Sequence, residues 1–192
     1  MLNLRDTQKE LLKKHIQKGS VVADFTMGNG NDTLWLSNQV GENGKVFAFD
    51  IQEAAVYNTK ALLEKENCAQ NYTLIKDSHH LLKNYIDCPL DAGIFNLGFL
   101  PGGDKSLTTL RSTTLPAIET ALTLIKAGGC LMIAIYPGHE EGRLEGELIC
   151  DILSKYDQKH LSAYRFNVLN AATSPYFIYV EINEKYKGGI TK

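Results

Sequence analysis

Residues 20–33 read Ser-Val-Val-Ala-Asp-Phe-Thr-Met-Gly-Asn-Gly-Asn-Asp-Thr, and a second apolar run ends at Asp50. The run before the glycines is typical of a short buried strand, and Gly28 and Gly30 permit a tight turn before a helix. Asp50 lies 20 residues beyond Gly30, the spacing at which an acidic residue meets a ribose in nucleotide-binding βαβ units. The stretch predicts an open α/β sheet with a site for a nucleoside-containing cofactor.

Apolar runs alternate with amphipathic segments along the rest of the chain. We expect an amphipathic lead-in helix over residues 4–18, within the first 19 residues. Further helices are expected from Asn31 or Asp32 to Val40, over 53–66, about 113–126 and 140–155, with a short helix through Leu82. Strands are expected at 21–25, 45–49, 72–75, 91–95, 130–136, 165–169 and 176–182.

This alternation predicts one α/β domain over residues 1–192 with a doubly wound, Rossmann-like sheet. Strands connected by helices pair in parallel through right-handed crossovers. The last two expected strands are joined by residues 170–175 without a helix, so they form an antiparallel pair at one edge of a mostly parallel sheet.

The composition is that of a globular protein, with 22% charged and 44% hydrophobic residues. The longest apolar run, 130–136, is far short of the roughly 20 residues that a membrane helix needs. The four cysteines are widely spaced and the five histidines form no metal-binding pattern. We therefore expect a cytoplasmic protein with buried thiols, no metal and no membrane partner.

The formal net charge of -2 gives no overall attraction to nucleic acid. A local patch would have to bind RNA, and Arg5, Lys9 and Lys13 recur every four residues on the first helix, beside Lys14 and Lys18. A solvated helix face explains the same spacing and stays open.

The glycine turn fits a cationic ligand better than a diphosphate. The dinucleotide pattern G-x-G-x-x-G ends in Thr33 here, and Asp24 and Asp32 flank the turn. Each carboxylate close to a pyrophosphate would cost on the order of 1 kcal/mol or more. S-adenosylmethionine carries an ammonium and a sulfonium and no phosphate, so we prefer it to the nicotinamide cofactor of a reductase.

Two further sites are expected at the carboxyl edge of the sheet, where ligands of such folds bind. Asp50 is placed to accept both ribose hydroxyls. Asp77, Ser78 and His79 follow the third strand, where an adenine would lie. A helix cap by Asp77 or Ser78 is the alternative.

Four segments of the chain resemble the small bacterial family of putative rRNA methylases: 24–33, 77–80, 96–105 and 136–139. The resemblance covers nearly the whole length and implies a class I methyltransferase fold that uses S-adenosylmethionine. The best-understood members of this family methylate the aminomethyl group on the 5-position of 2-thiouridine at the tRNA wobble position. That reaction forms 5-methylaminomethyl-2-thiouridine.

The resemblance also implies roles for single residues in cofactor binding. It assigns the methionine portion to the segment around Gly28 and Gly30, the ribose to the tip of the second strand, and the adenine to the tip of the third. The residues concerned are Asn29, Asn31, Asp32 and Thr33, then Asp50 and Gln52, then Ser78 and His79.

Asn96-Leu-Gly-Phe99 occupies the place where many amino-methylating enzymes carry Asn-Pro-Pro-Tyr. Asn96 can orient a nitrogen through its side-chain carbonyl, and Phe99 can stack on a base or belong to the core. Methyl transfer to nitrogen needs a positioned, neutral amine, which a dry pocket favours. Candidates for handling its proton are Asp104, Tyr136 and His139.

The expected partner is the anticodon arm of tRNA, met by the catalytic domain alone or with a second subunit in a homodimer. Three alternatives remain open at this level. They are an rRNA methyltransferase, a small-molecule amine or phenol methyltransferase of the same fold, and an RNA-binding module without a cofactor.

Overall fold

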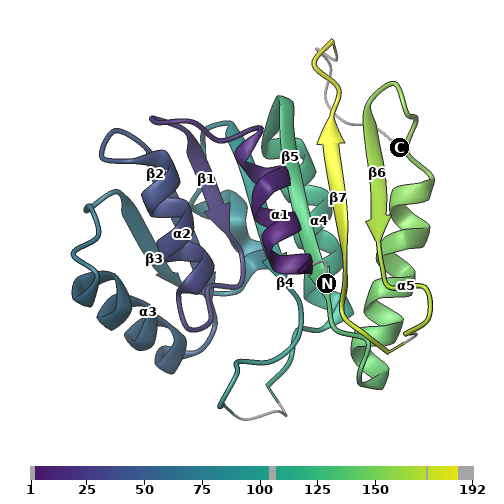
Figure 1. Ribbon diagram of the computed structural model, residues 1–192, viewed down its shortest axis with the longest axis horizontal. Coiled ribbons are helices and arrows are strands. Elements are labelled where there is room, and N and C mark those ends of the chain that lie inside the picture. The colour runs from purple at the N-terminus through teal and green to yellow at the C-terminus, as the bar shows by residue number, and fades with distance from the viewer. Residues whose placement is uncertain (1–2, 104–106, 172, 186–192) are drawn as a thin grey trace.

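The computed structural model describes residues 3–103, 107–171 and 173–185. Within these ranges seven strands form one sheet in the order β3-β2-β1-β4-β5-β7-β6, with helices on both faces (Figure 1). The strands are β1 (Val21–Asp24), β2 (Lys45–Asp50), β3 (Tyr72–Lys76), β4 (Leu90–Asn96), β5 (Ile125–Ile135), β6 (Leu161–Phe166) and β7 (Tyr176–Ile182). The helices are α1 (Leu4–Lys13), α2 (Asn31–Val40), α3 (Glu53–Lys65), the short η1 (His79–Asn84), α4 (Arg111–Leu124) and α5 (Glu140–Ser154).

The strand pairing confirms the predicted architecture. The neighbouring pairs among β1 to β5 are parallel. β7 lies between β5 and β6 and runs antiparallel to both. The chain therefore has the mostly parallel, Rossmann-like sheet with one antiparallel strand near its C-terminus.

Two apolar layers hold the helices to the sheet. On one face Leu12 of α1 and Leu36 of α2 pack with Val22, Ile94 and Met132 of the sheet. On the other face, side chains of α4 and α5 pack against Phe95 and Leu131. The strands of the centre are buried on both faces, which explains their continuous apolar sequences.

Two helices, α1 and α4, differ from their predicted bounds by more than one residue. α1 ends at Lys13 rather than residue 18, and His15, beyond its end, contacts the Gly128 carbonyl and the Tyr179 hydroxyl through its ring nitrogens. α4 begins at Arg111 and contains Pro116, which we expected only in a first turn. Its end at Leu124 leaves Ile125 free to start β5, where it pairs with Leu90.

The sixth strand and the thiols also differ from expectation. β6 covers 161–166 instead of 165–169, because Leu161 pairs with Ile182 at the far end of β7. Leu169, predicted as strand, is 93% exposed beyond it. Cys130 is buried as expected, whereas the other three cysteines are only partly buried.

The strand order places the candidate site. The sheet order reverses between β1 and β4, whose carboxyl ends lie side by side at the lower edge in Figure 1. Ligands of open α/β sheets bind at such a switch point. The loops that follow β1, β2, β3, β4 and β5 all leave the sheet at this edge.

We predict that Leu12→Ala lowers the free energy of unfolding by about 2–4 kcal/mol, because the side chain of Leu12 on α1 is only 1% exposed. Leu169→Ala is the matched control, since its side chain is 93% exposed, and it should change stability by less than about 0.5 kcal/mol. Urea unfolding followed by circular dichroism measures both. Equal stabilities of the two variants would show that α1 is not part of the cooperative fold.

Candidate active site

The turn after β1 has a backbone that only glycine accommodates easily. Gly28 and Gly30 have φ angles of 52° and 82°, in the left-handed region. A Cβ atom on Gly30 would lie 2.9 Å from the Cα atom of Thr59 in α3. The Thr59 hydroxyl also donates a hydrogen bond to the Gly28 carbonyl over 3.0 Å. Thr59 therefore fixes the turn against α3.

Asp50 closes this turn from the tip of β2. Its carboxylate accepts hydrogen bonds from the backbone N–H of Gly28 at 3.1 Å and of Gln52 at 2.9 Å. Burial raises the pKa of Asp50 above its ordinary value. The N–H of Gly28 is already paired with a carboxylate, so it is not free to bind a phosphate.

Asp24 and Thr33 lie beneath the turn, where neither side chain is exposed. The Thr33 hydroxyl donates to Asp24 over 2.7 Å, and the N–H of Thr26 donates to the same carboxylate over 3.2 Å. Burial, and then the nearby Asp32 carboxylate, raise the pKa of Asp24 to about 7. Asp32 and Asp50 are the acids of this group that reach the surface.

The most direct link between β4 and α2 is a hydrogen bond between two predicted site residues. The Asn96 side-chain Nδ2 donates to Asp32 Oδ2 over 2.9 Å, and the Asn96 backbone N–H donates to the Thr26 hydroxyl over 2.7 Å. Because the side-chain Nδ2 of Asn96 is held by Asp32, its side-chain oxygen Oδ1 is the atom that can accept a hydrogen bond from a ligand.

Asn29 connects the glycine turn to the loop after β4. Its Nδ2 donates to the Pro101 carbonyl over 3.1 Å, and its Oδ1 accepts from Asn58 of α3 over 3.0 Å. The side-chain amide thus has a protein partner at both ends. Asn31, the first residue of α2, is exposed beside it.

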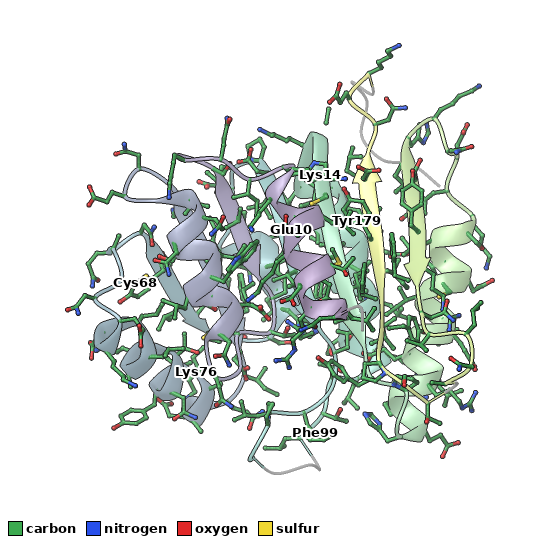
Figure 2. The ribbon with its side chains drawn as sticks, in the orientation of Figure 1. Glu10, Lys14, Cys68, Lys76, Phe99 and Tyr179 are labelled. Carbon is green, nitrogen blue, oxygen red and sulfur yellow. The ribbon has the colours of Figure 1, made fainter. Side chains whose placement is uncertain are left out.

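A buried carboxylate anchors the same loop on its other side. The N–H of Gly98 donates to the Thr109 hydroxyl, which donates to Glu145 of α5, both over 2.9 Å. Glu145 is 1% exposed, and burial raises its pKa. The bond from Gly98 to Thr109 thus joins the two ends of the loop. Figure 2 shows Phe99 on the part of the loop that projects from the sheet edge.

The residues after β3 are turned in different directions. Asp77 accepts hydrogen bonds from the Ser78 N–H at 2.7 Å and the Tyr85 hydroxyl at 2.6 Å, and the bond from Tyr85 lowers its pKa. His79 points inward, is 9% exposed, and has Nδ1 3.3 Å from the Phe25 carbonyl. Burial lowers the pKa of His79 to about 4, so the ring is neutral. Ser78 is the more accessible neighbour.

Tyr136 and His139 lie on the loop between β5 and α5. His139 caps α5, since its Nδ1 accepts the N–H of Gly142 over 3.1 Å. Its Nε2 is buried without a partner in the described part of the chain, and its ring centre lies 6.3 Å from that of Phe99. Asp104 lies outside the described residues.

Thr26 and Thr59 were not anticipated, although both hold the site together. Each is an ordinary polar residue in its local sequence, and its role depends on a contact with a distant segment.

No group of three or more potential metal ligands occurs among the described residues. Within those ranges, no helix is long and apolar enough to cross a bilayer.

Comparison with known proteins identifies relatives of this chain. The family model described as "Putative rRNA methylase" matches residues 46–181. A chloroplastic tRNA (mnm(5)s(2)U34)-methyltransferase of Arabidopsis thaliana is 35% identical over 180 residues, which cover 86% of this chain. The chain spans 64% of the length of that relative.

Solved structures agree with this assignment. A putative rRNA methylase from Clostridium thermocellum is 40% identical with a TM-score of 0.91, and the match covers 95% of this chain and 98% of that one. A putative methyltransferase from Streptococcus mutans, solved in complex with SAH, is 35% identical with a TM-score of 0.86 and coverage of 95% and 99%. The sequence, the strand order and these relatives together show that the chain belongs to the putative rRNA methylase family and has the Rossmann-like fold of class I methyltransferases.

Proposed function

We propose that this protein is an S-adenosylmethionine-dependent tRNA methyltransferase. Its proposed reaction is N-methylation of the 5-aminomethyl group of 2-thiouridine at the wobble position. The name of the Arabidopsis relative supports the substrate, and the bound SAH of the Streptococcus mutans relative supports the cofactor. The observation that carries the proposal is the Asn96–Asp32 hydrogen bond, which joins an amine-orienting group to the glycine turn.

The residues of the turn fit S-adenosylmethionine. Asp32 and Asp50 present carboxylates beside the turn, where a cationic ligand is stabilised and a diphosphate is repelled. Asp50 and Gln52 would hold the ribose, and Asn29, Asn31 and the surface of the turn would hold the methionine portion. The adenine would lie near Asp77, Ser78 and His79, with Ser78 as the accessible contact.

S-adenosylmethionine supplies an activated methyl group, and the protein must present a neutral amine in line with it. Asn96 Oδ1 would accept one N–H of that amine and orient its lone pair. Asp32 keeps the Asn96 amide from rotating, because it holds the Nδ2 end. The amine loses one proton when it gains the methyl group, and Tyr136, His139 and Asp104 are the proposed groups for its removal.

The proposed partner is the anticodon arm of tRNA, bound by the single domain over residues 1–192 in the cytoplasm. Basic side chains of α1 offer a surface for its phosphates, although two of them also have contacts within the protein. Lys9 lies 5.6 Å from the centre of the Trp35 ring, and Lys13 pairs with Glu10 at 2.6 Å. A homodimer would enlarge this surface.

The proposed activity predicts methylation of one defined nucleoside. The purified protein, given S-adenosylmethionine and tRNA that carries 5-aminomethyl-2-thiouridine, should add the mass of one methylene unit to that nucleoside in a digest analysed by mass spectrometry. Because phosphate contacts release counterions, the rate at low tRNA concentration should fall steeply with salt. Methylation of a small amine or of rRNA, with tRNA unchanged, would contradict the proposal.

Asn96→Ala should lower kcat by about 10²-fold, because the amine loses the group that orients it. Affinity for SAH, measured by titration calorimetry, should be unchanged, since Gly28 and Asp50 are still bonded to each other. Asn38→Ala, an exposed position on the same helix as Asp32, is the matched control. A normal single-turnover rate in Asn96→Ala would remove Asn96 from the mechanism.

A further inference from the structure

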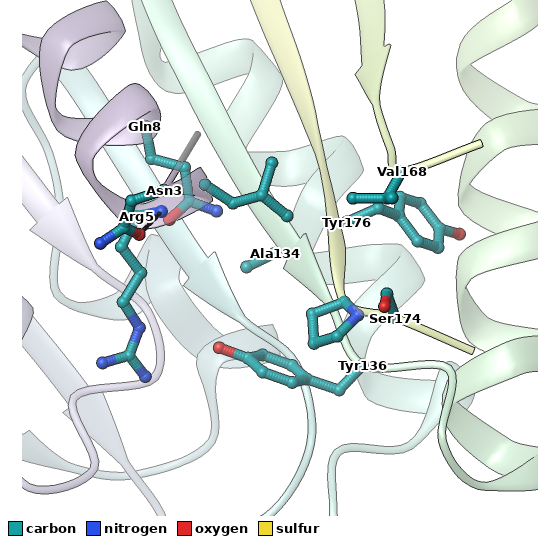
Figure 3. Close-up of a pocket in the computed structure, with 10 residues that line it drawn as sticks. Asn3, Arg5, Gln8, Ala134, Tyr136, Val168, Ser174 and Tyr176 are labelled. Atoms are coloured by element: carbon teal, nitrogen blue, oxygen red, sulfur yellow. Dashed lines mark hydrogen bonds between the residues drawn. The ribbon is translucent and has the colours of Figure 1, made fainter. Parts of the chain in front are cut away.

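A pocket of about 560 Å³ opens at the same edge of the sheet (Figure 3). It lies between α1, the end of β5 and the turn between β6 and β7. The residues that line it include Arg5, Gln8, Ala134, Tyr136 and Val168. This volume is within the range of pockets that hold small organic ligands.

The pocket lies one strand away from Asn96. Asn96 of β4 is in register with Ala134 of β5, which lines the pocket. Both side chains are on the face covered by α1 and α2, as are their neighbours Ile94 and Met132 two residues earlier. Adjacent strands are about 4.8 Å apart. The pocket therefore begins about one strand spacing from Asn96, on the side away from β1.

Gln8 provides an unused polar group inside this pocket. Its side chain comes from α1, is 8% exposed, and makes no hydrogen bond to any residue that the structure describes. The amide is not among the buried polar groups that lack a partner, so it is open to water within the cavity. Figure 3 shows the Gln8 amide directed from the helix toward the cavity. A ligand in the pocket would replace this water as the hydrogen-bond partner of the amide.

Tyr136 and Arg5 complete the site on the open side. The Tyr136 ring forms one wall, and its Cδ2 atom lies 4.0 Å from the position of a Cβ on Gly98, so it also borders the loop after Asn96. Arg5 is exposed at the same end of α1, and Figure 3 shows its guanidinium extending toward the sheet edge. An aromatic wall suits a planar base, and a guanidinium suits a phosphate.

We propose that this pocket binds the base of the nucleoside to be methylated, turned out of the RNA strand, with the Gln8 amide bonded to its polar edge. This inference rests on the proposed function and adds the position of the substrate. A uracil-type ring has an N–H donor beside a carbonyl acceptor, which an amide matches with two hydrogen bonds. The short aminomethyl arm of such a base then reaches Asn96, one strand away.

The test is Gln8→Met, which keeps the length and helix propensity of the side chain and removes the amide. Loss of a hydrogen bond to a buried base should lower kcat/KM for tRNA by about 10-fold, mostly through KM. SAH affinity by calorimetry and the melting temperature should equal those of the wild type. Gln17→Ala, whose side chain is exposed beyond α1, is the control and should leave kcat/KM unchanged.

Val168→Trp tests the same pocket from its rim. Val168 is 42% exposed and lines the cavity, so a larger side chain there narrows the cavity without disturbing the core. Methylation of tRNA should fall while SAH binding persists. If wild type methylates tRNA and both variants match it in KM and kcat, the pocket assignment is wrong and the proposed function stands. If wild type methylates no tRNA, both are wrong.

Discussion

The hydrogen bond from Asn96 Nδ2 to Asp32 Oδ2, 2.9 Å long, joins the two halves of the site. Asp32 belongs to the first turn of α2, beside the glycine turn, and Asn96 ends β4. Because the sheet order reverses between β1 and β4, these two residues meet where a ligand can lie across the strand ends. One acid thus borders the cofactor region and fixes the group proposed to orient the acceptor amine.

The charges around the turn explain why a cationic ligand fits this fold. Asp24, Asp32 and Asp50 are close enough that both other carboxylates raise the pKa of Asp24, in addition to the larger effect of burial. The pKa of Asp24 is raised to about 7, and its carboxyl group is hydrogen-bonded to Thr33 beneath the turn. The negative charge at the surface therefore comes from Asp32 and Asp50. A sulfonium and an ammonium would offset it, whereas a diphosphate would add to the repulsion.

Local sequence predicts the parts of the site that depend on backbone geometry. The turn at Gly28 and the position of Asp50 follow from strand and glycine patterns, and the structure pairs them directly. Thr59 and Gln8 could not be found in this way, because their roles arise from packing between distant segments. The bounds of β6 differ from the predicted bounds for a similar reason. Its exposed residues show no alternation of apolar and polar side chains, and its pairing with β7 determines where it begins and ends.

We propose that the acidic turn selects a cationic methyl donor over a dinucleotide. Titration calorimetry of the wild-type protein with SAH, S-adenosylmethionine and NAD, under one buffer condition, tests it most directly. We expect saturable binding of SAH and S-adenosylmethionine, and no binding of NAD at the same concentrations. Tighter binding of NAD, with no heat from either S-adenosylmethionine or SAH, would contradict it.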